Sequence, residues 1–460
     1  MRRSTARKRL LALAGTALVA AIAFAGTALA HGGSLRTEAG SMSVPTWLFL
    51  LTGGGVVGAS FLLASFVTDR ALIRAIHDWR RVASAPLAGL TTVTQALSVL
   101  ALVGVVAVGF DGPTDPLRNA AVLVVWVGWW AGYVATVYLV GNTWPALNPW
   151  RAVTQWLPTL DRNYPDKLGA WPSVVGLLAL IWLEVVSPLA DDPRLLATVI
   201  AGYSAVTLAG ALAFGPDRWF GHVDPVARVF RYYGRVAPLR YGDDGLELRP
   251  PGAALAEPKL VDDADEVAFV VAILWVTTFD GLVGTPQWAE FAEAVVGAGV
   301  PAVVVYPSAL VAGFGLFLWA YWTAARYSRQ TADTYLTVGA IARRFAPSLL
   351  PIAAGYHLAH FLGYFLSLSP ALASALTNPW NPPINPSVIV LPDWFGGLAV
   401  AFVLLGHLLA VWVAHASAYE VFPGRLQAVR SQYPFVIVMV LYTMTSLWIV
   451  SAPSAEPPFV

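Results

Sequence analysis

The stretch Ala346-Pro-Ser-Leu-Leu-Pro-Ile-Ala-Ala-Gly-Tyr-His-Leu-Ala-His-Phe-Leu-Gly-Tyr-Phe-Leu-Ser-Leu-Ser369 is 24 residues long and contains no Asp, Glu, Lys or Arg. An α-helix needs about 20 such residues to cross the roughly 30 Å hydrocarbon core of a bilayer. The stretch therefore predicts a membrane-spanning helix. It also carries His357 and His360, and ionisable groups at membrane depth are costly and usually face a cavity or a partner.

Nine further stretches have the same apolar character. Of the 460 residues, 57% are hydrophobic and 12% are charged, whereas soluble domains are about 25% charged. This composition excludes a conventional soluble enzyme, and the net charge of +1 argues against a nucleic-acid partner. We predict an all-α membrane protein with about ten transmembrane helices and the lipid bilayer as its main partner. The nine stretches cover residues 45–67, 87–110, 119–140, 170–187, 195–214, 266–284, 301–324, 393–417 and 433–451.

Residues 1–30 have the pattern of a secretory signal peptide. Basic residues come first, an apolar run follows from Leu10, and Ala28-Leu-Ala30 offers small residues at a cleavage site. The alternative is an uncleaved first transmembrane helix. If cleavage follows Ala30, His31 becomes the first residue, and its amine and ring nitrogen together suit a metal ion, copper above all.

Basic residues are distributed unevenly between alternate loops. With the mature N-terminus outside, the cytoplasmic loops hold 20 of the 28 Lys and Arg, the outer segments hold three, and the signal peptide holds five. This asymmetry follows the positive-inside rule. We therefore predict a multi-pass protein of the plasma membrane, with both mature termini outside.

The spans and loops define four parts of the chain. After the signal peptide, residues 31–214 hold spans one to five, with an amphipathic interfacial helix expected near 149–160 on the inner leaflet. Residues 215–265 form a small, solvated cytoplasmic loop domain, in which 239–241 and 246–248 predict a short hairpin. Residues 266–460 hold spans six to ten and most of the polar membrane residues.

Six ionisable residues at membrane depth are candidates for a metal site. His360, His407, Asp280 and Glu184 have positions along their spans that allow them to meet in a cavity open to the outside, within reach of His31 on its 13-residue tail. Histidine with carboxylate suits copper or zinc, with iron as a further option. The competing interpretation is that each histidine only bonds a neighbouring helix. The six residues are Glu184, Asp280, His357, His360, His407 and His415.

Cysteine and methionine are scarce. The chain has no Cys and four Met, which excludes thiolate metal sites and argues against a soft-metal path across the membrane.

Short segments with a recognisable pattern follow one another along the chain: Ala30-His-Gly, Val44-Pro-Thr-Trp-Leu-Phe, Leu147-Asn-Pro-Trp-Arg, Arg235-Val-Ala-Pro-Leu, Leu246-Glu-Leu-Arg-Pro-Pro, Thr278-Phe-Asp-Gly, Phe345-Ala-Pro-Ser-Leu-Leu-Pro-Ile, Ala359-His, His407, Ala414-His, Gln432-Tyr-Pro and Met439-Val-Leu-Tyr-Thr. In this order they resemble the polytopic membrane proteins known as fenitrothion hydrolase subunits. The resemblance implies hydrolysis of an organophosphate triester, a small-molecule substrate and a second membrane subunit. Its matching positions are His31, Asp280, His360, His407 and His415. The chain departs from the family's pattern in having an extra histidine at His357, Ala416 in place of an acidic residue, and a different outer loop at 370–392.

The sequence thus favours a membrane hydrolase that acts on phosphotriester-like esters through metal-activated water. Asp280 would be a ligand or general base, His360 and His407 ligands, and His31 a further ligand at the mouth of the site. Three alternatives stay open: a non-hydrolytic protein of copper or other metal acquisition or transport, a redox protein with haem on histidines of the eighth and ninth spans, and a structural role.

Overall fold

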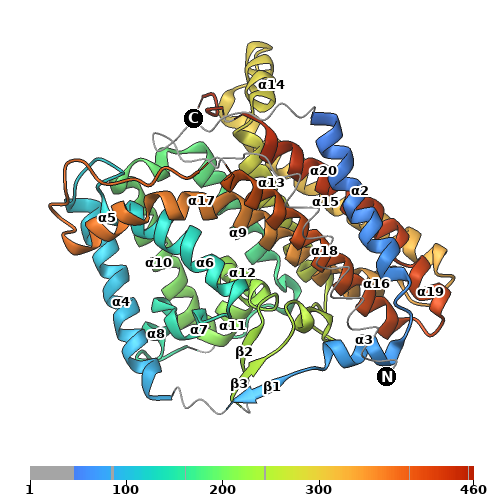
Figure 1. Cartoon of the computed structure of the whole chain (residues 1–460). Helices are drawn as coiled ribbons and strands as arrows, with labels where there is room; N and C mark the ends of the chain where they lie inside the picture. Colours follow the sequence, from blue (N-terminus) through green and yellow to red (C-terminus); the bar gives the residue numbers. More distant parts are fainter. Residues whose placement is uncertain are drawn as a thin grey trace.

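The computed structural model describes residues 46–83, 88–160, 162–242, 245–392, 394–453 and 455–459. The expected signal peptide and His31 lie outside these residues. Within them the chain forms a bundle of long helices with a small sheet at one end (Figure 1).

Eight helices of the described chain are long and apolar enough to cross a membrane. A ninth candidate is α2 (Thr46–Ser65), which is followed after a bend of 115° by α3 (Arg70–His77). The apolar helix α9 (Trp171–Val186) is shorter, with 16 residues. The predicted class of multi-pass α-helical membrane protein is confirmed. The eight are α4 (Ala88–Asp111), the helix Ala120–Leu139, α10 (Pro193–Phe214), α13 (Ala264–Val283), α15 (Ala302–Thr331), α17 (Leu350–Thr377), α18 (Phe395–Val421) and α20 (Tyr433–Ser451).

Helix Ala120–Leu139 contains an 11-residue π-helical segment, Leu123–Tyr133, between α5 (Ala120–Val122) and α6 (Val134–Leu139). The remaining elements are short. They are α7 (Trp144–Leu147), α8 (Pro149–Thr154), α11 (Pro216–Arg218), α12 (Pro225–Tyr233), α14 (Pro286–Gly297), α16 (Val338–Phe345), α19 (Arg425–Arg430), the 3₁₀ turns Asp166–Leu168, Pro188–Ala190, Ala253–Ala256 and Ala346–Leu349, a second π-helical segment Trp219–Val223, and strands β1 (Arg81–Ala83), β2 (Leu239–Gly242) and β3 (Gly245–Leu248).

Several helices begin with the same local signal, a capping side chain followed directly by proline. Asn148, Asp192, Asp224 and Thr285 each accept a hydrogen bond from a backbone N–H of the first turn, and each precedes a proline. The cap satisfies an otherwise unpaired donor, and proline at the first helical position has no N–H to satisfy.

The predicted cytoplasmic loops are joined at one end of the bundle, which we call the sheet end. Strand β1 pairs with β3, so the loops after α3 and after α12 meet there. The sheet end lies at the bottom of Figure 1. Further contacts join the other loops to this end. Arg70 Nη1 donates to Tyr419 O at 2.6 Å, Gln427 Nε2 donates to Asp333 O at 3.2 Å, and Arg151 forms an ion pair with Asp217.

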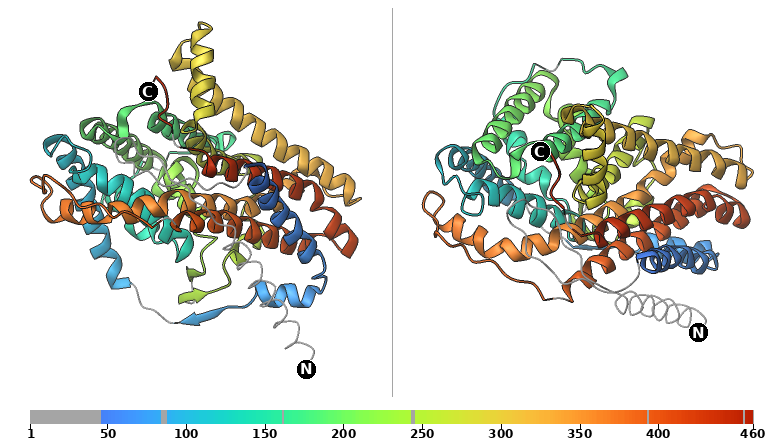
Figure 2. Two further views of the ribbon diagram at one scale, coloured as in Figure 1. Left: turned by 45° about the horizontal axis from the view of Figure 1, so that its top comes forward. Right: turned by 90° about the horizontal axis from the view of Figure 1, so that it is seen from above.

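The predicted outer loops meet at the opposite end, which we call the α14 end. There Arg118 Nε donates to Pro383 O at 3.2 Å, Arg194 Nε donates to Phe110 O at 3.3 Å, and the Ala455 N–H donates to Gly284 O at 2.8 Å. The predicted alternation of loops is therefore present in the fold. Figure 2 shows α14 projecting from this end beside the C-terminus.

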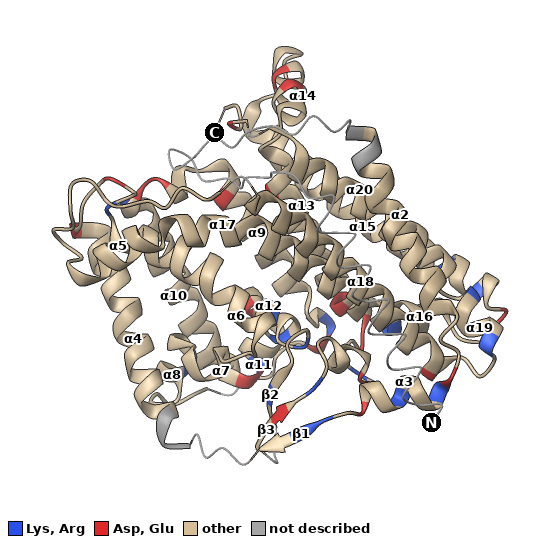
Figure 3. Ribbon diagram, in the orientation of Figure 1, with Lys and Arg blue, Asp and Glu red and all other residues tan. Residues whose placement is uncertain are grey.

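Basic residues gather at the sheet end (Figure 3). All 20 Lys and Arg that the sequence analysis assigned to cytoplasmic loops belong to this end, whereas the described α14 end has Arg118 and Arg194. Which end faces the cytoplasm stays a prediction.

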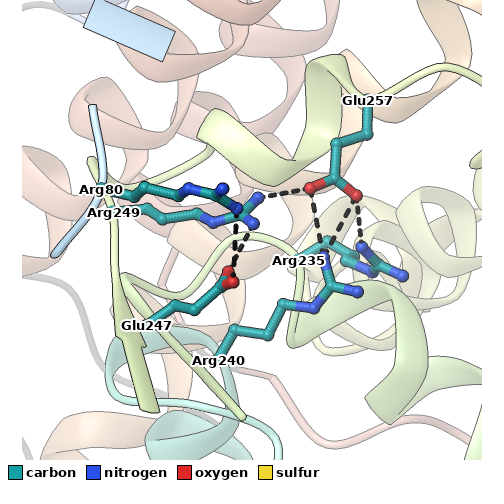
Figure 4. Close-up of polar contacts among 6 residues, drawn as sticks. All are labelled: Arg80, Arg235, Arg240, Glu247, Arg249 and Glu257. Atoms are coloured by element: carbon teal, nitrogen blue, oxygen red, sulfur yellow. Dashed lines mark hydrogen bonds and ion pairs between the residues drawn. The ribbon is translucent and has the colours of Figure 1, made fainter. Parts of the chain in front are cut away.

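The expected hairpin is confirmed, and a third strand joins it. β2 and β3 pair in an antiparallel register, and the sheet order is β1-β3-β2. Two carboxylates hold this sheet end together (Figure 4). Glu257 pairs with Arg235 at 2.7 Å, with Arg240 at 3.1 Å and with Arg249, and Glu247 pairs with Arg80 at 3.6 Å and with Arg249.

Residues 215–265 are less solvated than the sequence suggested. Phe230, Tyr232 and Tyr233 of α12 are fully buried, as is the turn Ala253–Ala256, because both segments pack into the helical bundle. Part of this segment therefore packs against the bundle, while the hairpin and its loops form the expected cap.

The interfacial helix is shorter than the predicted 149–160. Helix α8 ends at Thr154. A continued helix would bring the ring of Pro158 against the carbonyl of Thr154, four residues earlier. Trp150 is buried and donates to Ser204 Oγ, whereas Trp156 and Leu160 are 60% and 66% exposed. The exposed apolar side chains therefore lie on the turn and the irregular chain that follow α8.

Two glycines set the spacing of α17 and α18, the helices that carry most of the histidines. A Cβ on Gly355 would lie 2.6 Å from Phe402 O, and a Cβ on Gly406 would lie 2.4 Å from Pro351 O. Only glycine allows the two backbones to approach this closely. The crossing fixes the positions of His357, His360 and His407.

Candidate functional site

The structure brings Asp280 of α13 and His360 of α17 together. Asp280 Oδ2 lies 3.6 Å from His360 Nε2, and the side chains are 16% and 6% exposed. Asp280 lies three residues before the end of α13 at Val283, and this end is close to the C-terminal segment, because the Ala455 N–H binds Gly284 O. The pair therefore sits toward the α14 end, as predicted for an outward-facing site.

Glu184 of α9 is the second carboxylate in this region. It lies two residues before the end of α9 at Val186 and is close enough to Asp280 for their charges to interact. Its Oε2 is buried and has no hydrogen-bond partner among the described residues. A buried acceptor without a partner costs about 1–3 kcal/mol, so this oxygen is a candidate for contact with a ligand or a water.

Glu184 and Asp280 both line a cavity of about 580 Å³. Its walls come from α4, the π-helical segment, α9, α10, α13 and α17, and they are almost entirely apolar. Ligand pockets are typically about 300–1,000 Å³ with a few placed polar groups. The two carboxylates are the charged side chains of this wall.

The π-helical segment supplies the aromatic part of the wall through Trp126, Trp129, Trp130 and Tyr133. π-helical turns are rare and often mark functional sites. The sequence analysis gave these aromatic residues no role.

Tyr356 is a further residue of the site that the sequence analysis did not single out. Its ring stacks on His360 with centroids 6.0 Å apart, and it lines the cavity. Its hydroxyl lies against Gly281, because a Cβ there would be 2.1 Å from Tyr356 Oη. The signal was present in the sequence, since Tyr356 precedes His360 by one helical turn and Gly281 directly follows Asp280.

His357 does not join Asp280 and His360. Its Nδ1 lies 3.0 Å from Tyr138 Oη, and its ring packs among Trp130, Tyr233 and Phe361. The sequence placed His357 and His360 on one helical face. The structure gives them different neighbours, because three residues of a helix turn about 300° rather than a full circle.

His415 of α18 is held away from the pair, and His407 makes its Nδ1 contact within α18, while its buried Nε2 has no hydrogen-bond partner among the described residues. His407 Nδ1 lies 2.8 Å from Val403 O within its own helix. His415 lies at the sheet end, with Nδ1 3.3 Å from Gln432 Oε1 and Nε2 3.0 Å from Val67 O. His415 therefore acts as a bridge between helices, the interpretation that competed with a metal role.

The distance between Asp280 Oδ2 and His360 Nε2 is compatible with an ordinary His–Asp pair and with two ligands of one metal ion. Two ligand atoms at about 2.0–2.1 Å from a tetrahedral zinc ion lie roughly 3.3 Å apart, which is near the observed 3.6 Å. Glu184 adds a nearby carboxylate oxygen without a partner. No group of three or more His, Asp or Glu among the described residues is arranged to hold a metal. His31, the expected additional ligand, lies outside them.

Comparison with protein families, with curated proteins and with solved structures finds no match to this chain. The resemblance to the fenitrothion hydrolase subunits therefore stays a prediction.

Proposed function

We propose that this chain is an integral membrane hydrolase that cleaves an uncharged ester of the phosphotriester type in the cavity beside Asp280 and His360. The observation that carries the proposal is the Asp280–His360 pair, 3.6 Å apart, with Asp280 in the wall of an apolar cavity of about 580 Å³. An apolar wall suits a neutral triester, and the family resemblance supplies the reaction class.

Asp280 and His360 are the proposed ligands of a divalent cation, copper or zinc, with His31 as a further ligand. Such a cation would polarise a phosphoryl oxygen and lower the pKa of a bound water toward 7. His407, His357 and His415 are not proposed as ligands, because their contacts lie elsewhere.

Glu184 is proposed as the general base. Its buried Oε2 has no partner among the described residues, so it is available to accept a proton from the attacking water. The water oxygen then bonds to phosphorus while the bond from phosphorus to the leaving oxygen breaks. The leaving group departs as an alcohol or phenol after protonation, and a phosphodiester remains.

The alternatives from the sequence have less support. Haem on His357 would need open space beside its ring, which four aromatic side chains pack against. Passage of a metal ion needs polar groups along the bundle. Toward the sheet end the candidate ligand for such a path is His415, and both of its ring nitrogens already contact Gln432 and Val67.

The test is hydrolysis of a dialkyl 4-nitrophenyl phosphate by the detergent-purified protein, measured together with its metal content. Glu184→Gln is expected to lower kcat by about 10²–10⁴-fold, the usual contribution of a general base, and to retain the metal. His360→Ala and Asp280→Asn are expected to lose both.

His222→Ala is the matched control, because His222 is an exposed histidine at the sheet end. It should leave rate and metal content unchanged. Full activity in Glu184→Gln, or a wild-type protein that binds no copper, zinc or iron after reconstitution, would contradict the proposal.

A further inference from the structure

We infer that the ligand enters the cavity laterally from the bilayer. We infer that this ligand is a long uncharged amphiphile whose oxygen-bearing head lies beside Glu184 and Asp280. This inference adds the substrate class and its route of entry to the proposed function. That the bound amphiphile is hydrolysed rests on the proposed function. It is carried by the length of the cavity, its exposed side, its charge and its unpartnered polar atoms.

The cavity is elongated along the bundle. Its lining on α4 runs from Thr94 to Val105, a distance of about 16 Å at 1.5 Å per residue. This is about half of the roughly 30 Å hydrocarbon core, which is the depth of one leaflet and hence of one acyl chain. The wall also includes Trp150 toward the sheet end and Glu184 toward the α14 end.

One side of the cavity faces lipid past α4. Leu97 is 59% exposed and Ala101 is also exposed, yet both line the cavity. α4 is the least buried of the eight long helices, because only 11% of its 18-residue apolar stretch is buried. It is fixed near its two ends, where Gly109 packs closely on Ala197 and Gln95 binds Gln155. Its middle therefore forms the rim of an opening toward the bilayer.

The charge of the wall excludes an anionic ligand. Glu184 and Asp280 line the cavity, and no Lys, Arg or His is among its lining residues in the described chain. A fatty acid or a phosphodiester would bring a further negative charge beside two carboxylates, in a low-dielectric wall that contains no Lys, Arg or His among its described residues. His360 faces Asp280 at 3.6 Å, so Asp280 already has a polar partner and does not require a cationic ligand.

Unpartnered polar atoms indicate what the head of the ligand carries. Trp126 Nε1 and Tyr356 Oη are buried donors on lining residues, and neither has a hydrogen-bond partner in the described chain. Buried donors of this kind are rare in native proteins unless a ligand or water satisfies them. Ester or phosphoryl oxygens would accept from both, while the apolar tail fills the rest of the cavity.

The experiment measures binding without turnover, in nanodiscs of phosphatidylcholine. The probes are methyl 9,10-dibromo-octadecanoate, which is uncharged, and the free acid, which is anionic at pH 9. Bromine quenches tryptophan on contact, and five of the 19 Trp line the cavity: Trp126, Trp129, Trp130, Trp144 and Trp150. The ester is expected to give a saturable loss of about a quarter of the emission, in proportion to those five, and the acid none.

Ala101→Phe and Leu97→Phe narrow the opening, and each is expected to abolish the saturable component. Val103→Phe is the matched control, because Val103 lies on the same helix, is 60% exposed and does not line the cavity. Equal binding of the acid, or saturable quenching that survives in both Ala101→Phe and Leu97→Phe, would overturn the inference. Saturable quenching by the ester in a protein without triesterase activity would support this route and refute the proposed reaction.

Discussion

At the scale of single residues, the site depends on the close approach of α13 and α17 beside Asp280. Gly281 allows it, because a Cβ there would lie 2.1 Å from Tyr356 Oη and 2.7 Å from Ile449 Cγ2. Tyr356 in turn stacks on His360. A change at Gly281 therefore reaches both members of the Asp280–His360 pair.

Gly281→Ala is expected to destabilise the protein by about 1–3 kcal/mol, the usual effect of overpacking. The midpoint temperature of unfolding, followed by tryptophan fluorescence in detergent, measures this. Gly315→Ala is the control, because a Cβ on Gly315 in α15 meets nothing within 4 Å. Adding Tyr356→Phe to Gly281→Ala removes the hydroxyl that clashes and should recover part of the loss. If the double variant is no more stable than Gly281→Ala, Tyr356 is not the residue that Gly281 accommodates.

The sequence singled out residues whose polar group was unusual for its surroundings, and the structure places three of them in one region. Asp280, His360 and Glu184 stand out because charge is rare at membrane depth. Their partners were harder to predict, since helical spacing shows on which face of its helix a residue lies but not which helix that face contacts. His407 looked equivalent to His360, yet its Nδ1 lies near the carbonyl of Val403 in its own helix.

At the scale of elements, the short segments of the sheet end are joined mainly through Glu257. This carboxylate follows the turn Ala253–Ala256 and pairs with Arg235, Arg240 and Arg249, which lie on three other parts of the loop (Figure 4). Burial alone would raise the pKa of Glu257, but these three guanidinium groups outweigh it and the pKa is lowered.

Glu257→Gln should lower the stability of the protein by about 1–3 kcal/mol at neutral pH, because three arginines lose their common partner. Since the pKa of Glu257 is lowered in the fold, its contribution is fully present above its ordinary pKa of 4.5 and is lost as the pH falls through the lower folded value. The gap in unfolding midpoint between wild type and Glu257→Gln should therefore be constant from pH 8 to pH 6 and shrink below pH 4.5. Glu290→Gln, on exposed α14, serves as the control. A gap that widens in acid would contradict this role.

The elements themselves were predictable to different degrees. Apolar length identified the long helices, because the bilayer requires it, and turn residues identified the hairpin of β2 and β3. Strand β1 could not be predicted, since Arg81–Ala83 has only three residues and becomes a strand by pairing with β3. The π-helical segment Leu123–Tyr133 likewise has no sequence signal that separates it from an ordinary apolar helix.

At the scale of the whole molecule, the two ends differ in their number of basic residues. The sheet end holds 20 Lys and Arg and the described α14 end holds two. Membrane insertion retains basic loops in the cytoplasm, so we expect the sheet end inside the cell and the site near Asp280 closer to the outer surface. The orientation decides from which leaflet the cavity receives its ligand, because its carboxylates lie toward the α14 end.

The absence of cysteine from the chain makes the orientation directly measurable, since any introduced thiol is the only one. Tyr335 lies in the loop between α15 and α16 and is fully exposed, and Glu290 is exposed on α14. In intact cells a membrane-impermeant maleimide should label Glu290→Cys and leave Tyr335→Cys unlabelled until the membrane is opened. Labelling of Tyr335→Cys alone would place the sheet end outside, against its charge, and would put the Asp280–His360 pair on the cytoplasmic side. Labelling of both in intact cells would show that the two ends are not separated by the bilayer, and a multi-pass arrangement would then be untenable.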